Sequence, residues 1–293
     1  MTRVCSLLPS ATEIVADLGL ADALVAVSEE CKWPAEVQGK PRVTAARVDS
    51  ANLADAEIDR IVRDSIGSGR PLYTVDAQLI DELRPDVLIT QDLCTVCAVS
   101  SGDLATACPV GAEIISLDPR TLAEVADTVT LLAERLGAAA AGQRIVEEMS
   151  AKIEAVRTAV AGRPRPRVFV AEWIDPPFCA GHWVPEMVEA AGAAEVLGVA
   201  GQPSYSTTWD RVVEAQPELV VIAPCGFDAD AAAERAARLE LPARVVAVDA
   251  DSYFSRPAPR LADGVRQLGH LLHPDAVPDA GLPAIELAPA PTP

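Results

Sequence analysis

The sequence has no excess of basic residues and no long hydrophobic run. Its 293 residues carry a formal net charge of −19, whereas proteins that bind nucleic acid or anionic membrane surfaces present basic faces. No apolar stretch approaches the roughly 18–20 residues that a membrane-spanning helix needs. The composition therefore argues against nucleic acid as a partner and against a membrane-embedded protein.

The N-terminus, MTRVCSLLPSATEIV, also lacks the pattern of a signal peptide. Pro9 and Glu13 interrupt its apolar residues, and a signal peptide needs a continuous apolar core. We therefore predict a cytoplasmic location. In a reducing cytoplasm, the seven cysteines are small buried residues, metal ligands or reactive thiols rather than a disulfide framework.

Motifs of nucleotide-binding and hydrolytic enzymes are missing as well. No GxGxxG follows the first predicted strand, and no GxxxxGK[ST], HExxH or GxSxG segment occurs in the sequence, although each would be expected for its class of enzyme. No nucleophile lies next to a base in a triad-like context. We predict a protein that is not an enzyme and has no catalytic residues.

The apolar residues that are present follow two periodicities. Half of the residues are apolar, and short apolar runs alternate with amphipathic segments over residues 1–120 and again over 163–273. This alternation predicts two α/β lobes with mostly parallel sheets. Residues 121–162 have a helical pattern that Gly137 interrupts, so we predict a bridging helical segment there. The tail, 274–293, is rich in proline and alanine and is predicted to be disordered.

Aromatic residues are scarce, yet most of them follow predicted strands. In parallel sheets ligands bind outside the carboxyl ends of the strands, so two such lobes predict one ligand cleft between them. Aromatic side chains gathered in loops are typical of a ligand surface, although some can equally be core residues beneath the loops. The predicted strand-end loops hold Trp33, Trp173, Phe178, Trp183, Phe227, Tyr253 and Phe254.

Polar candidates lie in the same loops. Glu172 ends a buried strand beside Trp173, and His182 lies in the segment CAGHWVP. A neutral imidazole is a common metal ligand, and a carboxylate accepts hydrogen bonds from a ligand. Arg256 could hold carboxamides or carboxylates of a ligand.

The segment LITQDLCTVCAVS places two cysteines at CxxC spacing after an apolar run. Cys94 and Cys97 supply half of a metal site, and Cys31 and Cys225 follow other predicted strands. Together they could bind Zn²⁺ or an iron–sulfur cluster, or meet the metal of a bound chelate. Plain small loop residues are the other interpretation. A redox dithiol is disfavoured because the flanking residues do not resemble a thioredoxin-like site.

Three segments resemble the vitamin B12-binding substrate-binding proteins of ABC importers. They are RVCSLLPSATEIVADLGLADALVAVSEECKWP, RVFVAEWIDPPFCAG and YFSRPAPRLADGVRQL, and the resemblance extends over residues 3–273. It implies a periplasmic-binding-protein-like fold of two Rossmann-like α/β lobes, bridged by a long helix, that hold a corrin ring between them. The contacts that the resemblance implies are Pro9, Ser10, Ala11, Thr12, Trp33, Tyr73, Phe178, Tyr205, Tyr253 and Arg256.

The sequence departs from this family in an additional helical segment, about 49–70, and at two positions on the surface. The family docks on its importer through one glutamate per lobe, and Gln78 and Asp210 stand at the corresponding positions. These departures argue against docking on an ABC importer. We therefore predict a cytoplasmic two-lobed protein that binds cobalamin or a related corrinoid or metal chelate. The alternative is a thiolate metal or iron–sulfur protein, with or without catalytic activity, on the same scaffold.

Overall fold

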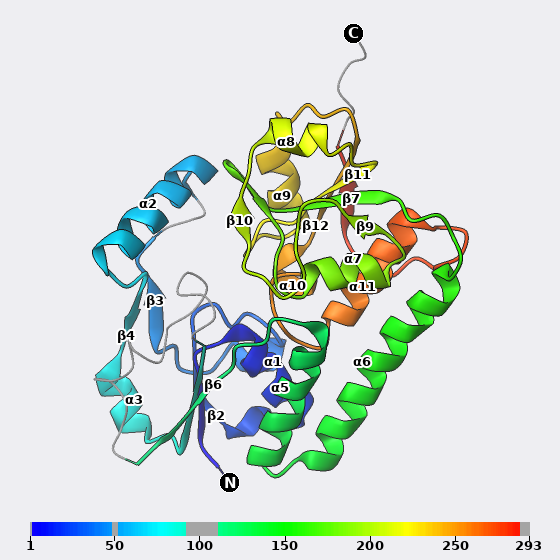
Figure 1. The fold of residues 1–293 in the computed structure, drawn as a ribbon. Coiled ribbons are helices and arrows are strands. Elements are labelled where there is room, and N and C mark those ends of the chain that lie inside the picture. The colour runs from blue at the N-terminus through cyan, green and yellow to red at the C-terminus, as the bar shows by residue number, and fades with distance from the viewer. Residues whose placement is uncertain (1, 49–51, 92–110, 288–293) are drawn as a thin grey trace. The chain divides into compact units, whose positions relative to one another are not determined.

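The computed structural model describes residues 2–48, 52–91 and 111–287 (Figure 1). Helices and mostly parallel strands alternate along the chain, which confirms the predicted α/β fold class. The chain forms two compact units, one of Met1–Pro119 with Asp127–Val146 and one of Arg120–Ala126 with Glu147–Pro293. Among the described residues, no helix has both the length and the apolar character needed to cross a membrane.

A parallel sheet of four strands, in the order β2-β1-β5-β6, forms the centre of the first unit. Every residue of β5 is buried, as expected for a parallel strand that is covered on both faces. The strands of this sheet are β1 (Val4–Ser6), β2 (Leu24–Val27), β5 (Val87–Thr90) and β6 (Glu113–Ser116).

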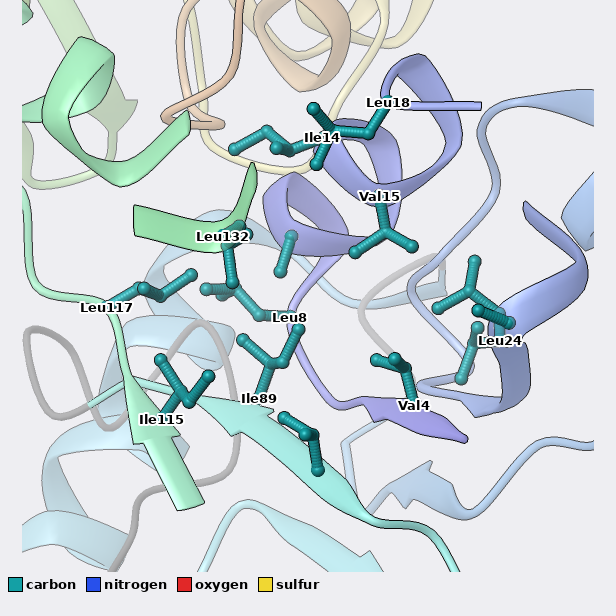
Figure 2. Packing of buried hydrophobic residues seen from close by; sticks show 14 of the residues in the cluster. Val4, Leu8, Ile14, Val15, Leu18, Leu24, Ile89, Ile115, Leu117 and Leu132 are labelled. Atoms are coloured by element: carbon teal, nitrogen blue, oxygen red, sulfur yellow. The ribbon is translucent and has the colours of Figure 1, made fainter. Parts of the chain in front are cut away.

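Helix α1 (Pro9–Asp17) packs its apolar face into the core of the first unit. Proline suits the first helical position, where its missing N–H breaks no intrahelical bond. Figure 2 shows Ile14 and Val15 of this helix near Val4 of β1 and Leu132, all within one buried cluster. Within the described part of the first unit, short helices also lie at η1 (Ala21–Ala23), η2 (Ala35–Val37) and α3 (Ala77–Leu83).

The additional helical segment is present as α2 (Asp55–Ser68), and it ends at Gly69, whose φ of 66° suits glycine. The chain enters and leaves this segment through β3 (Thr44–Ala46) and β4 (Tyr73–Val75), which pair antiparallel. Figure 1 shows α2 joined to the rest of the first unit through these two strands.

The helical segment predicted at 121–162 consists of two helices, α5 (Leu122–Arg135) and α6 (Ala139–Val160). Gly137, with a φ of 73°, separates them, as its position in the sequence predicted. Thr121 accepts a hydrogen bond from Glu124 N at 3.1 Å and so caps the first turn of α5. Both units contribute residues to each of these helices.

A larger sheet, in the order β10-β8-β7-β11-β12-β13 with β9 paired to β7, forms the second unit. The central strands β7, β11 and β12 are parallel, and β8, β10 and β13 run antiparallel to their neighbours. The strands are β7 (Arg167–Ile174), β8 (Pro177–Cys179), β9 (Ala194–Glu195), β10 (Tyr205–Ser206), β11 (Leu219–Ile222), β12 (Arg244–Val248) and β13 (Ala284–Glu286). The helices are α7 (Val184–Ala190), α8 (Trp209–Glu214), α9 (Ala229–Ala236), α10 (Ala250–Tyr253) and α11 (Leu261–Leu272).

The prediction of a disordered tail from residue 274 is wrong for residues 274–287. Strand β13 pairs with β12, Gln267 Nε2 donates to Pro283 O at 2.9 Å, and Glu286 forms an ion pair with Arg244. Composition alone misled here, because the exposed edge of β12 offers backbone groups that even a proline-rich segment can pair with.

Candidate functional site

The parallel strands of the second unit end at one edge of the sheet, and the predicted loops follow them there. Val220 and Val221 of β11 pair with Phe169 and Val170 of β7, and β12 continues the same register on the other side. Because the three strands run in the same direction, their carboxyl ends lie together. This edge is where an open α/β sheet binds ligands.

Three aromatic residues and one arginine lie near this edge, and we call them the aromatic cluster: Trp173, Phe178, Phe227 and Arg235. Trp173 pairs with Phe178 between β7 and β8. The ring centroids of Trp173 and Phe227 are 5.9 Å apart, and Arg235 Cζ lies 3.9 Å from the Phe227 ring centroid. These distances are typical of aromatic and cation–π pairs.

Sequence reasoning did not find Arg235, although it found the three aromatic residues. Arg235 lies in the last turn of α9, where a basic residue is common at the end of any helix. Its contact with Phe227 arises because α9 follows the loop after β11 and folds back over it. No local sequence signal marks that contact.

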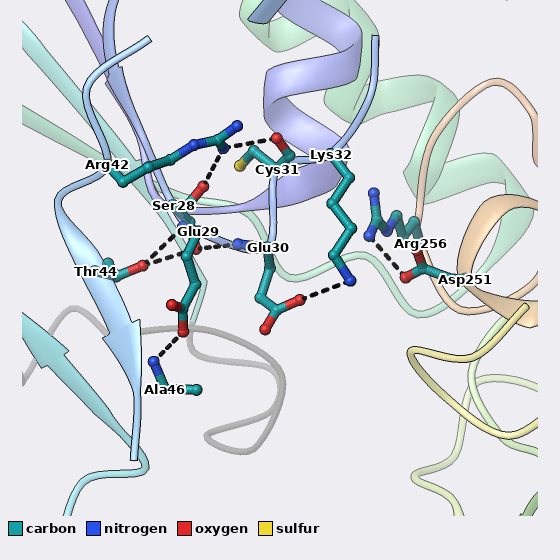
Figure 3. Close-up of polar contacts among 10 residues, drawn as sticks. All are labelled: Ser28, Glu29, Glu30, Cys31, Lys32, Arg42, Thr44, Ala46, Asp251 and Arg256. Atoms are coloured by element: carbon teal, nitrogen blue, oxygen red, sulfur yellow. Dashed lines mark hydrogen bonds and ion pairs between the residues drawn. The ribbon is translucent and has the colours of Figure 1, made fainter. Parts of the chain in front are cut away.

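The loops after β11 and β12 are joined by hydrogen bonds. Asp251 N donates to Phe227 O at 3.1 Å. Arg256, only 8% exposed, donates to Asp251 Oδ1 at 2.7 Å (Figure 3). Tyr253, between them in sequence, has Arg260 Cζ 5.6 Å from its ring centroid. Arg256 is therefore paired with an acid within the protein.

Glu172 connects three other segments near the carboxyl end of β7. Its carboxylate accepts hydrogen bonds from Gly181 N at 3.4 Å and from Ser204 Oγ, and its carbonyl accepts from Cys225 N at 3.1 Å. Gly181 is tightly enclosed, since a Cβ there would lie 2.5 Å from Gln202 O and from Ser204 N. Glu172 therefore has protein partners that orient it.

Two of the predicted aromatic contacts lie in the interior. Trp183 is 5% exposed and Phe254 is 2% exposed. Trp183 Nε1 donates to Phe254 O at 2.7 Å, which satisfies the indole N–H in a buried environment. The two residues are therefore part of the packed interior and connect the loop before α7 to the loop after α10.

His182 has a φ of 50°, a backbone conformation that is uncommon for residues other than glycine. Its N–H donates to Gln202 O at 2.7 Å, and its carbonyl accepts from Gly201 N at 2.9 Å. Burial lowers the pKa of the imidazole below its ordinary value, and the positive charge of Arg120 adds to the effect. A neutral imidazole with this environment can act as a metal ligand.

Tyr205 is an exposed residue on the edge strand β10. Its side chain is 42% exposed, and its hydroxyl donates to Leu197 O at 2.7 Å. Burial of the hydroxyl raises the pKa of Tyr205 above its ordinary value, and a hydrogen bond with Cys179 has the same effect. The ring is thus held at one end while much of its surface is accessible.

In the first unit, the residues from Pro9 to Thr12 form the first turn of α1 and are buried. Thr12 Oγ1 lies 2.8 Å from Ser6 Oγ and 3.0 Å from Cys31 Sγ. Within the described part of the chain, the buried Ser10 Oγ has no hydrogen-bond partner.

Polar contacts order the loop that carries Cys31 and Trp33. Arg42 Nη1 donates to Ser28 O and to Cys31 O, both at 2.7 Å, as Figure 3 shows. Trp33, two residues further along, is 46% exposed. Tyr73, at the start of β4, packs against a separate apolar cluster of the first unit. The loop therefore presents an exposed indole from a fixed backbone.

Two of the four cysteines of the predicted thiolate site, Cys94 and Cys97, lie outside the described residues. Cys31 is fully buried in the core of the first unit, and Cys225 is half-buried after β11. Among the described residues, no group of three or more His, Cys, Asp and Glu side chains could hold a metal ion. The thiolate site stays a prediction.

Known proteins are similar to the chain over most of its length. The vitamin B12-binding protein of Vibrio cholerae is 26% identical over 272 residues, which are 91% of this chain and 87% of the relative. The solved structure of the periplasmic vitamin B12-binding protein of the same species has a TM-score of 0.68 at 26% identity, covering 92% of this chain and 96% of the other.

Two further proteins are similar to the chain, one by its solved structure and one by its sequence. The periplasmic heme-binding protein RhuT of Roseiflexus sp. RS-1 has a TM-score of 0.69 at 21% identity, covering 94% of this chain and 99% of the other. An ABC transporter substrate-binding lipoprotein of Bacillus subtilis is 22% identical over 285 residues, which are 93% of this chain and 80% of the relative.

The predicted cytoplasmic location is contradicted by these similarities. The relatives are named as periplasmic proteins or as a lipoprotein, which are proteins that act outside the cytoplasm. The prediction rested on the missing signal-peptide pattern in the first residues. A signal peptide is removed during processing, so this pattern says nothing about where the folded protein acts.

The remaining comparison concerns the family as a whole. Residues 4–249 match the family described as periplasmic binding protein, and this range contains every described strand except β13. The match agrees with the prediction of a binding protein rather than an enzyme. The chain belongs to the periplasmic binding protein family.

Proposed function

We propose that the protein binds cobalamin or a closely related corrinoid outside the cytoplasm, through the aromatic cluster and the neighbouring loops. The observation that carries this proposal is the contact between the Trp173 and Phe227 rings at the carboxyl edge of the second sheet, where Phe178 pairs with Trp173 across β7 and β8. The relative named as a vitamin B12-binding protein, 26% identical over 91% of the chain, supports the choice of ligand.

A corrin ring is a large and mostly apolar macrocycle, and aromatic faces bind such a surface well. Trp173, Phe178 and Phe227 are each half-buried, so they keep exposed surface that a ligand can cover. Trp33 and Tyr205, at 46% and 42% exposed, have more. Large exposed aromatic side chains are costly in water, which favours a ligand that covers them.

The charged groups near the aromatic cluster fit a ligand with polar substituents. Arg256 is paired with Asp251, whereas Arg235 lies over Phe227. Carboxamide oxygens at the rim of a corrin ring accept hydrogen bonds from such groups. A neutral His182 could also reach the metal of the chelate, and we treat it as a candidate axial ligand.

Titration with cyanocobalamin, followed by calorimetry and by the absorbance of the corrin, tests the proposal. Trp173→Ala and Phe227→Ala should each weaken binding about tenfold, which corresponds to about 1.4 kcal/mol. Trp209→Phe is the matched control, because Trp209 is an aromatic residue of the same unit that packs on Phe169 and is not a predicted contact.

A wild-type protein that binds no cyanocobalamin at concentrations on the order of tens of micromolar would overturn the proposal. Hemin is titrated in parallel, since one protein of similar fold is named as heme-binding. Binding of hemin without binding of the corrinoid would replace the ligand in the proposal with heme. Native mass spectrometry of freshly isolated protein identifies any ligand or metal that co-purifies.

A relative named as an ABC transporter substrate-binding lipoprotein favours an importer as the partner of the loaded protein. Gln78 on α3 and Asp210 on α8 are both exposed, and they stand where the family resemblance places docking glutamates. We propose that these residues weaken docking. Gln78→Glu combined with Asp210→Glu should then strengthen binding to a vitamin B12 importer, and no change would contradict this.

A further inference from the structure

Glu195 is not one of the predicted ligand contacts, but it lies near one of them, Tyr205. It ends β9, next to β7. Its carboxylate accepts four backbone hydrogen bonds: Oε2 from Val170 N at 3.2 Å, and Oε1 from the N–H groups of Val196, Leu197 and Gly198, each at 3.1 Å. One carboxylate therefore orders three consecutive residues and connects them to β7.

The middle one of these residues, Leu197, holds Tyr205. Leu197 donates its N–H to Glu195 Oε1 at 3.1 Å and accepts, at its carbonyl, the hydroxyl of Tyr205 at 2.7 Å. The peptide groups of residues 196–198 thus connect the carboxylate of Glu195 to the ring of Tyr205. Tyr205 is 42% exposed, so the hydrogen bond of its hydroxyl is an important constraint on its orientation.

We propose that Glu195 is a positioning residue for ligand binding, which sets the orientation of Tyr205 through residues 196–198 and releases it when the carboxylate is protonated. This inference rests on the proposed function, because it takes Tyr205 as a ligand contact.

Protonation of Glu195 changes these hydrogen bonds unequally. A proton on Oε2 faces Val170 N–H, so two donors oppose each other and that bond is lost. The bonds to Oε1 then involve a neutral acceptor and become weaker, because charge-assisted hydrogen bonds are roughly twice as strong as neutral ones. Val196 N also donates to Val168 O at 2.9 Å, so β9 stays paired while Leu197 and Gly198 lose most of their support.

The position of Gly198 shows how closely this segment fits. A Cβ at residue 198 would lie 2.4 Å from Ala180 O and 3.0 Å from Glu195 Cγ. Contacts at such distances require the backbone to move. The segment therefore has little room to shift without moving the carbonyl that holds Tyr205.

Among the described residues, the titratable and charged groups around Glu195 have their own partners, as Arg165 has in Ala193 O. Cys179 on β8 and Tyr205 on β10 interact with it electrostatically, and Arg211 on α8 acts on Tyr205. On β7, Arg167 donates to Ala215 O and Gln216 O instead. On α7, Glu186 accepts from Leu122 N and Glu189 is exposed.

Burial raises the pKa of the Glu195 carboxyl to about 7, and the four backbone hydrogen bonds oppose the increase. The carboxyl therefore changes its protonation state between pH 6 and pH 8. The pKa of Cys179 and that of Tyr205 are both raised, so these two groups stay neutral over the same range. The pKa of His182 is lowered, which places its titration below that of Glu195.

The test follows the tyrosine rings by NMR in protein labelled with carbon-13 at the ring ε positions. The chain has only three tyrosines, and Tyr205→Phe assigns the signal of Tyr205. We expect this signal to shift with pH with a midpoint near 7. In Glu195→Gln it should stay at its low-pH position, because the amide presents a donor to Val170 N–H at every pH.

Binding of cyanocobalamin supplies the second measurement. The affinity of the wild type should fall about threefold to tenfold from pH 8 to pH 6, which corresponds to roughly 0.7–1.4 kcal/mol. Glu195→Gln should have the lower affinity at both pH values. The effect of Glu195→Gln should vanish in a Tyr205→Ala background, and Glu189→Gln, which removes an exposed carboxylate nearby, should behave as the wild type.

The outcomes separate the inference from the proposed function. A Tyr205 signal that ignores pH, or that titrates in Glu195→Gln as in the wild type, overturns the inference. Equal affinities of Glu195→Gln and the wild type for cyanocobalamin at pH 8 overturn it too. Failure of the wild type to bind any corrinoid overturns the proposed function instead, and the ring signals then still decide whether Glu195 controls Tyr205.

Discussion

The guanidinium carbon of Arg235 lies 3.9 Å from the centre of the Phe227 ring. A cation over an aromatic face is attracted by about 0.5–1 kcal/mol at exposed sites and by more when it is desolvated. Both residues are half-buried. The contact ties the loop after β11 to α9, so that Phe227 faces the ligand edge of the sheet from a supported position.

We predict that Arg235→Met lowers the free energy of unfolding by about 0.5–1 kcal/mol. Arg235→Lys should retain part of this contribution, because it keeps the charge but loses the planar stacking group. Urea denaturation measures both variants. In a Phe227→Leu background the effect of Arg235→Met should disappear, and an undiminished effect there would show that Arg235 acts through another partner.

Substitution by phenylalanine should cost much more stability at Trp183 than at Trp33. Trp183→Phe removes a buried hydrogen bond to Phe254 O and leaves that carbonyl unsatisfied, which costs about 1–3 kcal/mol of stability. Trp33 is 46% exposed, so Trp33→Phe should change stability by less than about 0.5 kcal/mol. Equal losses in thermal or urea unfolding would contradict the burial of Trp183.

Glu195 should make the stability of the protein depend on pH in an unusual direction. Its pKa is raised from an ordinary 4.5 to about 7, so between these values the folded protein binds more protons than the unfolded chain, and stability falls as pH rises. The free energy of unfolding of the wild type, minus that of Glu195→Gln, should decrease by roughly 3 kcal/mol from pH 4 to pH 8. An increase over that range would contradict the assignment.

The described cysteines should differ in reactivity toward a thiol reagent. Cys5, Cys31 and Cys179 are fully buried, and burial raises the pKa of Cys5 to about 12, so its reactive thiolate is scarce. Cys225 is half-buried. Mass spectrometry after brief maleimide treatment of the native protein should show Cys225 modified, with Cys5, Cys31 and Cys179 protected until urea is added. Early modification of Cys31 would contradict its place in the core.

Several elements could be predicted from the sequence because their causes are local. The helices on either side of Gly137 and the end of α2 at Gly69 follow from residues within one or two turns. The apolar run of β5 is buried throughout, as a central parallel strand must be. The concentration of aromatic residues around the strand ends also pointed to Phe227, which follows β11, and to Trp173, which lies within the end of β7 rather than in a loop.

Other features depend on which segments meet, and these could not be predicted. Trp183 and Phe254 were grouped with exposed loop aromatics, but packing around them buries both. Residues 274–287 were predicted to be disordered, but the edge of β12 orders 284–286. The sequence does not distinguish Glu195 from the other acidic residues. Its role depends on a hydrogen bond from Val170, which lies on another strand.

The sequence by itself determined the α/β class and the places of the helices around Gly137, of α2 and of β5. Periodicity, glycine and proline act over a few neighbouring residues, so they can be read directly from the chain. Only the tertiary structure decided that Phe227 meets Trp173 and Arg235, and that Glu195 supports Tyr205 through Leu197. Those contacts depend on sheet register and on how helices pack across it, and neither is encoded by adjacent residues alone.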